Sequence, residues 1–207
     1  MEFDYADCLS LWERQLLCVI VLPDKGAVFI DGGYFSKVRL TLGFASVHLD
    51  YASLSDKLCA GCDRFRTYYY DCMPYKDQTP SPDDEKRYKD KQVFIESLRN
   101  LDKFEIRLGH LLKTDGGDFK QKGVDILLSI DLTRLSWSKR IYKAILLTAD
   151  TDFIPAIQEA KNAGVTVTLA FCQTMSRQIS RALYQVCDER VRITADLLRD
   201  CTKQTVA

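Results

Sequence analysis

The sequence predicts an α/β protein built on a parallel β-sheet. Short apolar runs that are typical of buried strands alternate with longer segments in which apolar residues recur at helical spacing. This alternation favours parallel pairing, because each helix carries the chain back to the edge where the next strand begins. Three of the apolar runs also stop at or just before an aspartate, and in an open parallel sheet ligands bind beyond the carboxyl ends of the strands.

Six segments have the length and side chains of strands. The first ends at Asp31-Gly32-Gly33, a sequence that makes an ordinary tight turn and also lets a ligand approach the backbone closely. The second ends at Asp71, and the fourth ends just before Asp150. The six segments are residues 27–30, 65–70, 104–108, 144–147, 165–171 and, with a weaker signal, 191–193.

Four segments between these strands have the pattern of helices. Asp83 or Asp84 can cap the first of them, in which Phe94 and Leu98 share one face. The third accommodates Pro155 in its first turn. We expect these helices at about residues 83–100, 123–137, 152–163 and 176–187, and a short amphipathic helix or an extra strand at 9–22.

Length and composition fit a single folded domain. The chain has 207 residues, of which 46% are hydrophobic and 28% are charged, as in ordinary globular proteins. Basic and acidic residues number 29 each, so the net charge neither indicates nor excludes a polyanionic partner. We expect an N-terminal extension over residues 1–25, a domain over 26–195 and a C-terminal tail over 196–207.

The start of the sequence and its cysteines favour a cytoplasmic protein. The first residues carry Glu2, Asp4 and Asp7 rather than the basic residues that open a secretory signal peptide. The apolar stretch over 16–22 is far too short to span a bilayer. The eight cysteines are scattered and several lie in apolar runs, which favours reduced thiols. We therefore expect no membrane partner.

Aspartates recur where predicted strands end and predicted helices begin. Asp31, Asp71 and Asp150 each follow a strand, Asp152 comes two residues after Asp150, and Asp125 lies in the first turn of the helix expected at 123–137. Carboxylates that converge from separate elements repel one another unless a cation lies between them. Hard oxygen ligands in this number suit Mg²⁺ or Mn²⁺, either of which can activate water for attack on a phosphate.

Each of these aspartates also has an ordinary structural explanation. An aspartate at a strand end or helix start is often only a cap or a turn residue. For Asp152 a capping role is about as well supported as a metal-binding one, and for Asp71 a solvated turn is the better interpretation. It is the joint occurrence of several such carboxylates in one α/β chain that predicts a metal site.

Asp131 differs from the others because it lies on an apolar face. Val124, Leu128 and Leu135 form one stripe of the expected helix, and Asp131 falls on the same stripe. A buried carboxylate needs a partner or a raised pKa. Two interpretations stay open: Asp131 orients a metal-bound water from behind the site, or it accepts a hydrogen bond from neighbouring backbone.

Two short motifs and two long blocks carry a family resemblance. The motifs are residues 31–35 (DGGYF) and 68–71 (YYYD), and the blocks are residues 121–132 (QKGVDILLSIDL) and 145–155 (ILLTADTDFIP). In this combination they resemble the NYN family, the LabA-like branch of the PIN-like nuclease superfamily. The resemblance extends over roughly residues 27 to 193.

This resemblance implies a fold, an activity and a site. The implied fold is a Rossmann-like three-layer sandwich around a mainly parallel sheet. The implied activity is that of a metal-dependent ribonuclease acting on single-stranded or structured RNA. Many members have an Asn shortly after the first Asp, where this chain has Gly32-Gly33-Tyr34, and a Gly where it has Ala149. The implied catalytic and metal-binding residues are Asp31, Asp125, Asp150 and Asp152, with Asp131 and Asp71 in supporting roles.

A ribonuclease also needs contacts to phosphates and bases around its acidic centre. Lys122 lies just before a helix N-terminus, which itself attracts anions. Tyr34 is a candidate for stacking on unpaired bases, and Arg177 lies at the start of the last predicted helix. Further cations that could frame a groove are Lys37, Arg39, Lys139, Arg140, Lys143 and Arg181.

The leading hypothesis is therefore an Mg²⁺- or Mn²⁺-dependent endoribonuclease. An alternative is a catalytically weak or inactive RNA-binding or scaffold protein of the same fold, which the missing Asn after Asp31 favours. A phosphatase with Asp31 as covalent nucleophile is disfavoured, because Gly33 stands where that chemistry usually has a second Asp. Cys59 and Cys62 have zinc-like spacing but no matching second pair. The apolar N-terminal segment offers a surface for a homodimer.

Overall fold

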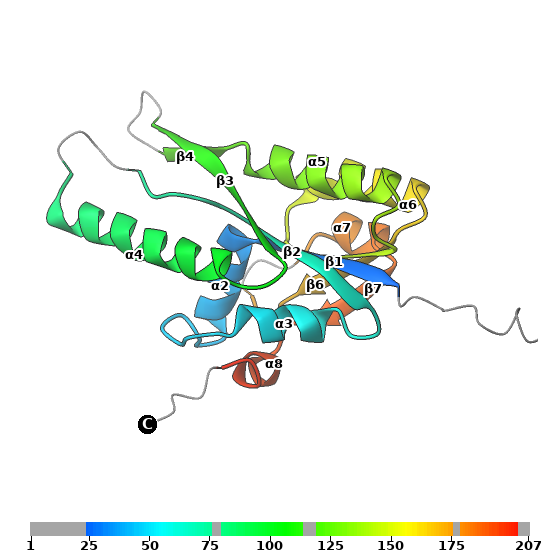
Figure 1. The fold of residues 1–207 in the computed structure, drawn as a ribbon, viewed down its shortest axis with the longest axis horizontal. Coiled ribbons are helices and arrows are strands. Elements are labelled where there is room, and N and C mark those ends of the chain that lie inside the picture. The colour runs from blue at the N-terminus through cyan, green and yellow to red at the C-terminus, as the bar shows by residue number, and fades with distance from the viewer. Residues whose placement is uncertain (1–23, 76–79, 114–118, 176–178, 203–207) are drawn as a thin grey trace, which may run out of the picture.

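The computed structural model describes residues 24–75, 80–113, 119–175 and 179–202. Strands and helices alternate through most of these residues, as Figure 1 shows. The elements are β1 (Lys25–Asp31), α2 (Gly32–Thr41), α3 (Tyr51–Leu58), β2 (Asp63–Cys72), α4 (Pro82–Arg99), β3 (Phe104–Lys113), β4 (Phe119–Lys122), α5 (Val124–Trp137), β5 (Lys143–Leu147), the 3-10 helix η1 (Thr151–Phe153), α6 (Ile154–Asn162), β6 (Thr166–Phe171), α7 (Arg181–Val186), β7 (Glu189–Arg192) and α8 (Ala195–Arg199).

The strands form a seven-stranded sheet in the order β4-β3-β2-β1-β5-β6-β7. Six of them run parallel, and only β4 is antiparallel to its neighbour β3. From β1 the chain first builds outward through β2 and β3, and then crosses to the other side of β1 to add β5, β6 and β7. The order therefore reverses between β1 and β5, and at such a switch point the loops diverge and leave a crevice at the carboxyl ends of the strands.

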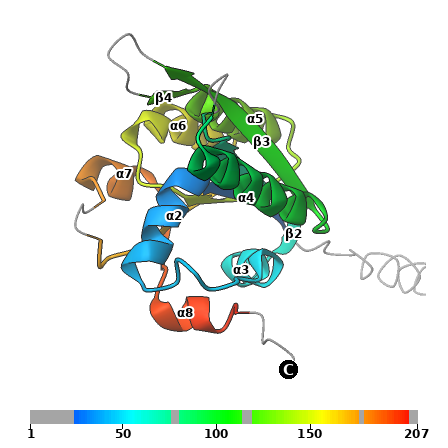
Figure 2. The same ribbon diagram turned by 90° about the vertical axis from the view of Figure 1, so that its left-hand side faces the viewer.

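Helices cover both faces of the sheet. In Figures 1 and 2, α2, α3, α4 and α8 lie on one side and α5, α6 and α7 on the other. The alternation of side chains along β1 explains both layers: Ala27 and Phe29 enter the core beneath α5 and α6, whereas Val28 and Ile30 enter the core beneath α2 and α3. All four side chains are fully buried. The predicted sandwich with a mainly parallel central sheet is confirmed.

Each predicted strand has a counterpart, but the sequence did not indicate several other elements. The tight turn that was one of two interpretations of Gly32-Gly33 is absent: α2 begins at Gly32, capped by Asp31. Glycines have poor helix propensity, and this start depends instead on the cap and on tertiary packing. Helix α3, helix α8 and strand β4 were also missed, because they are short and their packing is decided by distant residues.

Residues 196–202, the described part of the expected C-terminal tail, belong to the folded domain. We expected a tail from residue 196, but Leu198 and Cys201 are buried in the same core as β1 and α2. The backbone N–H of Asp50 donates to the carbonyl of Cys201 at 2.7 Å, and Leu49 forms a bridge with Thr202. Residues 1–23 of the expected extension lie outside the described residues; Asp24 is described, and β1 begins at Lys25. No helix among the described residues is long and apolar enough to cross a membrane.

Candidate metal centre

The switch point between β1 and β5 brings two predicted site segments together. Ile30 of β1 pairs with Leu147 of β5. The residues that follow them, Asp31 and Thr148, therefore both lie at the carboxyl edge of the sheet. The hydroxyl of Thr148 donates to Asp31 Oδ2 at 3.3 Å and accepts from the backbone N–H of Asp150 at 3.2 Å. Buried Thr148 thus links the two carboxylate-bearing segments, a role that its place between Leu147 and Asp150 did not reveal.

Asp31 is a half-buried carboxylate that caps a helix. Its Oδ1 accepts the backbone N–H of Tyr34 at 3.0 Å and so caps α2. Burial raises the pKa of Asp31 above its ordinary value, and the charge of Asp125 adds to this, although the hydrogen bonds from Tyr34, Thr148 and Gly33 oppose it. The carboxylate is therefore held in place by donors, and no described Lys or Arg side chain forms an ion pair with it.

The sequence left open whether Asp152 caps a helix, and the structure gives the capping role to Asp150 instead. Asp150 is the cap of η1, because its Oδ1 accepts the backbone N–H of Asp152 at 2.9 Å. The side chain of Asp152 is exposed and caps nothing. Asp150 therefore orients the start of η1, whereas the carboxylate of Asp152 accepts no hydrogen bond and forms no ion pair within the part of the chain that the structure describes.

Asp125 comes to the same region from α5, which lies on the same face of the sheet as α6. It lies in the first turn of α5, which begins after Gly123, where a positive φ of 92° reverses the chain. Burial raises the pKa of Asp125, followed by the charges of Asp150 and Asp152. Asp125 therefore lies close enough to the loop after β5 for the charges of that loop to raise its pKa.

Together, Asp31, Asp125, Asp150 and Asp152 form what we call the carboxylate centre. Within the described part of the chain none of the four makes an ion pair. In their present positions, no three acidic, histidine or cysteine side chains of the described residues are grouped closely enough to hold a metal ion. The donor chemistry still fits a hard cation, because uncompensated carboxylates on separate elements repel one another until a positive charge joins them.

Asp71 is not in the solvated turn that we expected. It lies inside β2 and is only 6% exposed. Its carboxylate forms an ion pair with Lys91 of α4 and accepts the hydroxyl of Tyr69 at 3.0 Å. The strand continues past the predicted end because β3 pairs with it as far as Cys72. Asp71 therefore anchors α4 to the sheet beside the carboxylate centre, with its charge already compensated.

Gly32 is required by the close packing between Asp31 and Asp71. A Cβ at this position would lie 2.5 Å from Asp71 Oδ2 and 2.6 Å from the Tyr69 hydroxyl oxygen. Both neighbours are buried and cannot move aside. Only glycine therefore lets α2 start directly on β2, which is the physical reason for a Gly after Asp31.

Asp131 is buried, as its place on the apolar stripe predicts, but its partners are side chains rather than backbone. Its Oδ2 accepts the Tyr70 hydroxyl at 3.1 Å and Arg107 Nε at 3.0 Å, and its Oδ1 accepts an Arg134 N–H at 2.7 Å. Burial and the charge of Asp131 raise the pKa of Tyr70. These contacts assign Asp131 to docking α5 on β2 and β3.

Several predicted RNA contacts need correction. Tyr34 is 7% exposed and packs in the core, where its hydroxyl accepts the backbone N–H of Cys172 at 3.1 Å, so it cannot stack on a base. Arg39 donates to the carbonyls of the loop that follows α2, including that of Val47 at 2.7 Å, so it too has a structural role. Arg177 and the side chain of Lys122 lie outside the described residues.

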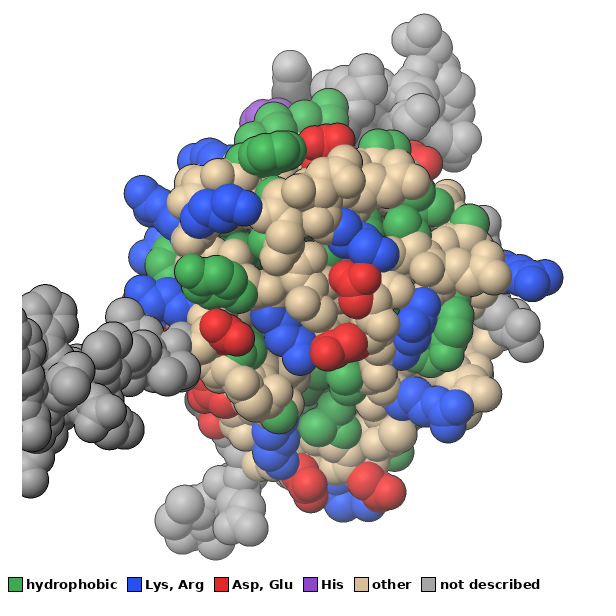
Figure 3. All heavy atoms as spheres, turned by 90° about the vertical axis from the view of Figure 1, so that its right-hand side faces the viewer, with side chains coloured by type: hydrophobic (Ala, Val, Ile, Leu, Met, Phe, Trp, Pro, Cys, Tyr) green, Lys and Arg blue, Asp and Glu red, His purple; other side chains and the backbone are tan. Residues whose placement is uncertain are grey.

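Basic residues before β5 lie on the wrong side of the molecule for this site. Residues that precede a parallel strand lie at its amino end, opposite the carboxyl edge. Lys143 begins β5 and forms an ion pair with Glu189 at 2.8 Å, and Lys139 donates to the carbonyl of Ala163. Figure 3 shows this amino-terminal side of the sheet, where basic and acidic side chains are interspersed.

Comparisons with known proteins agree with this architecture. The family model for the NYN domain matches residues 25–194. The uncharacterized protein y4oD of Sinorhizobium fredii (strain NBRC 101917 / NGR234) is 36% identical over 73 residues, which cover 35% of this chain and only 32% of that protein. A crystal structure of a protein of unknown function from Vibrio parahaemolyticus RIMD 2210633 superposes with a TM-score of 0.60 at 17% identity, covering 85% of this chain and 96% of the other. The solved structure shows a shared fold.

Proposed function

This chain belongs to the NYN domain family, and from that membership we propose that it is a metal-dependent endoribonuclease. The NYN family is part of the PIN-like nuclease superfamily. The observation that carries the proposal is the carboxylate centre at the switch point: besides burial, the charge of Asp125 raises the pKa of Asp31, and the charges of Asp150 and Asp152 raise the pKa of Asp125. None of the four makes an ion pair within the described residues. The switch point is where an open parallel sheet binds its ligand.

In this proposal Asp31, Asp125, Asp150 and Asp152 hold Mg²⁺ or Mn²⁺, which supplies charge neutralisation and an activated water for attack on the phosphodiester. The protein supplies the geometry. Thr148 fixes Asp31 from behind, and Asp150 uses one oxygen for the cap of η1 and keeps the other for a ligand. Burial raises the pKa of Asp125 and the charges of Asp150 and Asp152 add to it; a bound cation would offset the repulsion between these carboxylates.

The test is cleavage of labelled single-stranded RNA in the presence of Mn²⁺, with and without a chelator. We expect cleavage that the chelator abolishes, and a loss of at least about 100-fold in Asp150→Asn, because the ligand charge is removed while a capping side chain is kept. Asp63→Asn is the matched control, since Asp63 lies at the amino edge in an ion pair with Lys103 at 3.4 Å.

The outcome distinguishes this function from the alternative. Cleavage that persists in Asp150→Asn would contradict the site assignment, and chelator-insensitive cleavage would contradict the metal requirement. The alternative, an RNA-binding protein without turnover, is favoured by one observation: no three acidic groups of the described residues are already close enough to hold a metal. It predicts RNA binding in a gel-shift assay and no cleavage with either ion.

A further inference from the structure

A second reactive group lies at the opposite edge of the sheet, in the turn between α3 and β2. Cys59 ends α3, and Cys62 comes just before β2. The backbone N–H of Cys62 donates to the carbonyl of Cys59 at 2.9 Å, and Gly61 between them has a φ of +88°. A four-residue turn of this kind holds its first and last Cα atoms within about 7 Å, which overlaps the range that a disulfide spans.

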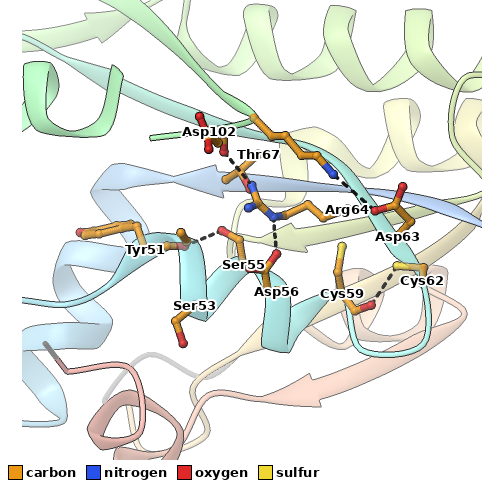
Figure 4. Close-up of polar contacts among 12 residues, drawn as sticks. Tyr51, Ser53, Ser55, Asp56, Cys59, Cys62, Asp63, Arg64, Thr67 and Asp102 are labelled. Carbon is orange, nitrogen blue, oxygen red and sulfur yellow. Dashed lines mark hydrogen bonds and ion pairs between the residues drawn. The ribbon is translucent and has the colours of Figure 1, made fainter. Parts of the chain in front are cut away.

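The two sulfurs also lie on the same side of this turn. A Cβ built on Gly26 of β1 would be 2.4 Å from Cys62 Sγ and 3.1 Å from Cys59 Sγ. Both sulfurs therefore pack over the backbone of Gly26 and lie close to one another. Any side chain at residue 26 would displace them. Cys62 Sγ donates to the carbonyl of Cys59 at 3.0 Å, as Figure 4 shows.

The two thiols differ in access. Of the six cysteines that the structure describes, all free thiols, only Cys62 is partly exposed and the other five are buried. Burial raises the pKa of Cys59, and the neighbouring Cys62 adds to the effect. Cys62 is thus the thiol that a dissolved reagent meets first, and Cys59 is shielded behind it.

We propose that Cys59 and Cys62 are a reversible dithiol–disulfide pair that is oxidised by small dissolved disulfides such as glutathione disulfide. The Cys62 thiolate attacks one sulfur of the oxidant, whose S–S bond breaks, releasing one glutathione and leaving a mixed disulfide. Cys59 then loses its proton and attacks Cys62 Sγ, the mixed disulfide breaks, and the second glutathione leaves. The protein gives up two electrons and two protons, which reduce the oxidant to two thiols.

This pair is independent of the proposed nuclease activity. It lies at the amino ends of β1 and β2, whereas the carboxylate centre lies beyond the carboxyl ends of β1 and β5. Among the described residues, no third cysteine, histidine or acidic side chain joins it to form a metal site. The geometry thus points to bond formation between the two sulfurs rather than to structural zinc.

The experiment treats the folded, reduced full-length chain with glutathione disulfide, blocks the remaining thiols with an alkylating reagent and digests with trypsin. Cleavage after Lys57 and Arg64 releases residues 58–64 (LCAGCDR), a peptide that contains both cysteines and no others. We expect this peptide to lose two hydrogens and to escape alkylation. Treatment with a reductant should return the two hydrogens and make both thiols reactive to the alkylating reagent again. The peptides that contain buried Cys72 and Cys187 should be fully alkylated when the treated chain is unfolded in the presence of the reagent. Full alkylation means that these thiols escaped oxidation, because the fold was intact and kept them from the oxidant.

Two variants identify the order of events. In Cys59→Ser the glutathione adduct should persist on Cys62, because the second thiol is missing, and in Cys62→Ser the peptide should stay unmodified. A stable glutathione adduct in the unsubstituted chain, or no change in its peptide, would overturn the proposal. Circular dichroism of each variant shows whether it is folded, and the unsubstituted chain supplies a result that does not depend on either substitution.

Discussion

At the scale of single residues, small differences in position decide the structure of the carboxyl edge. Gly32 and Gly33 are adjacent and both follow Asp31, yet only Gly32 faces the sheet. A Cβ on Gly32 would overlap Asp71 and Tyr69, whereas one on Gly33 would meet only Asp31 Oδ1, at 3.3 Å. The two glycines therefore have different reasons to be there, and substitution separates them.

We predict that Gly32→Ala destabilises the protein by about 1–3 kcal/mol, because the added methyl group overfills a space between buried side chains. Gly33→Ala is the matched control. It adds the same methyl group and the same gain in helix propensity at the next residue, so its effect should stay within about 1 kcal/mol. Urea unfolding of both variants measures the difference, and equal midpoints would contradict the packing argument.

At the scale of elements, the docking of α5 combines apolar packing with one buried carboxylate. Val124, Leu128 and Leu135 enter the core beneath the sheet, and Asp131 lies among them with three side-chain donors. A buried charge is tolerated only when its hydrogen-bonding capacity is satisfied. Because α5 also carries Asp125, the same contacts hold one arm of the carboxylate centre in place.

We predict that Asp131→Asn lowers the free energy of unfolding by about 2–3 kcal/mol, because half-buried Arg107 loses one of its two charged partners and keeps only Glu105. Asp196→Asn in α8 is the control, since the ion pair of Asp196 with Arg199 is exposed and is worth less than about 1 kcal/mol. Chemical denaturation checks both. A loss in Asp131→Asn no larger than in the control would mean that the network does not stabilise α5.

At the scale of the whole molecule, the carboxylate centre makes stability depend on pH in an unusual direction. The pKa of Asp31 is raised above 3.8 by burial, so folding favours its protonated form. Its contribution is therefore most favourable below pH 3.8 and is lost as pH rises through the folded pKa. Asp188 has the opposite behaviour, because its ion pair with Lys161 at 2.9 Å helps to lower its pKa, so its contribution is lost as pH falls.

We predict that Asp31→Asn, measured without divalent ions, is more stable than the unsubstituted chain near neutral pH. Asn preserves the cap of α2 and removes the charge. The advantage should shrink as pH falls toward 3.8, whereas Asp188→Asn should be less stable at neutral pH and converge with the unsubstituted chain on acidification. Melting temperatures across this pH range test both, and parallel curves for the two variants would contradict the assigned directions.

Local patterns in the sequence were enough to predict the alternation of strands and helices, and they led to the proposal that Asp31, Asp125, Asp150 and Asp152 form one site. Periodicity and the position of a residue at a strand end are properties of short segments, so they can be read without knowing the neighbours. The parallel pairing of the strands could also be predicted, because helical crossovers of this length connect parallel strands.

Only the tertiary structure decided which polar residues near the carboxylate centre can contact a ligand. Asp71 looked like another strand-end carboxylate, but β3 and Lys91 cover it. Tyr34 looked available for a base, but α2 turns it into the core. Both outcomes depend on residues distant in sequence, whose packing sets burial and pairing, and burial and pairing determine whether a polar side chain can serve a ligand or must serve the fold.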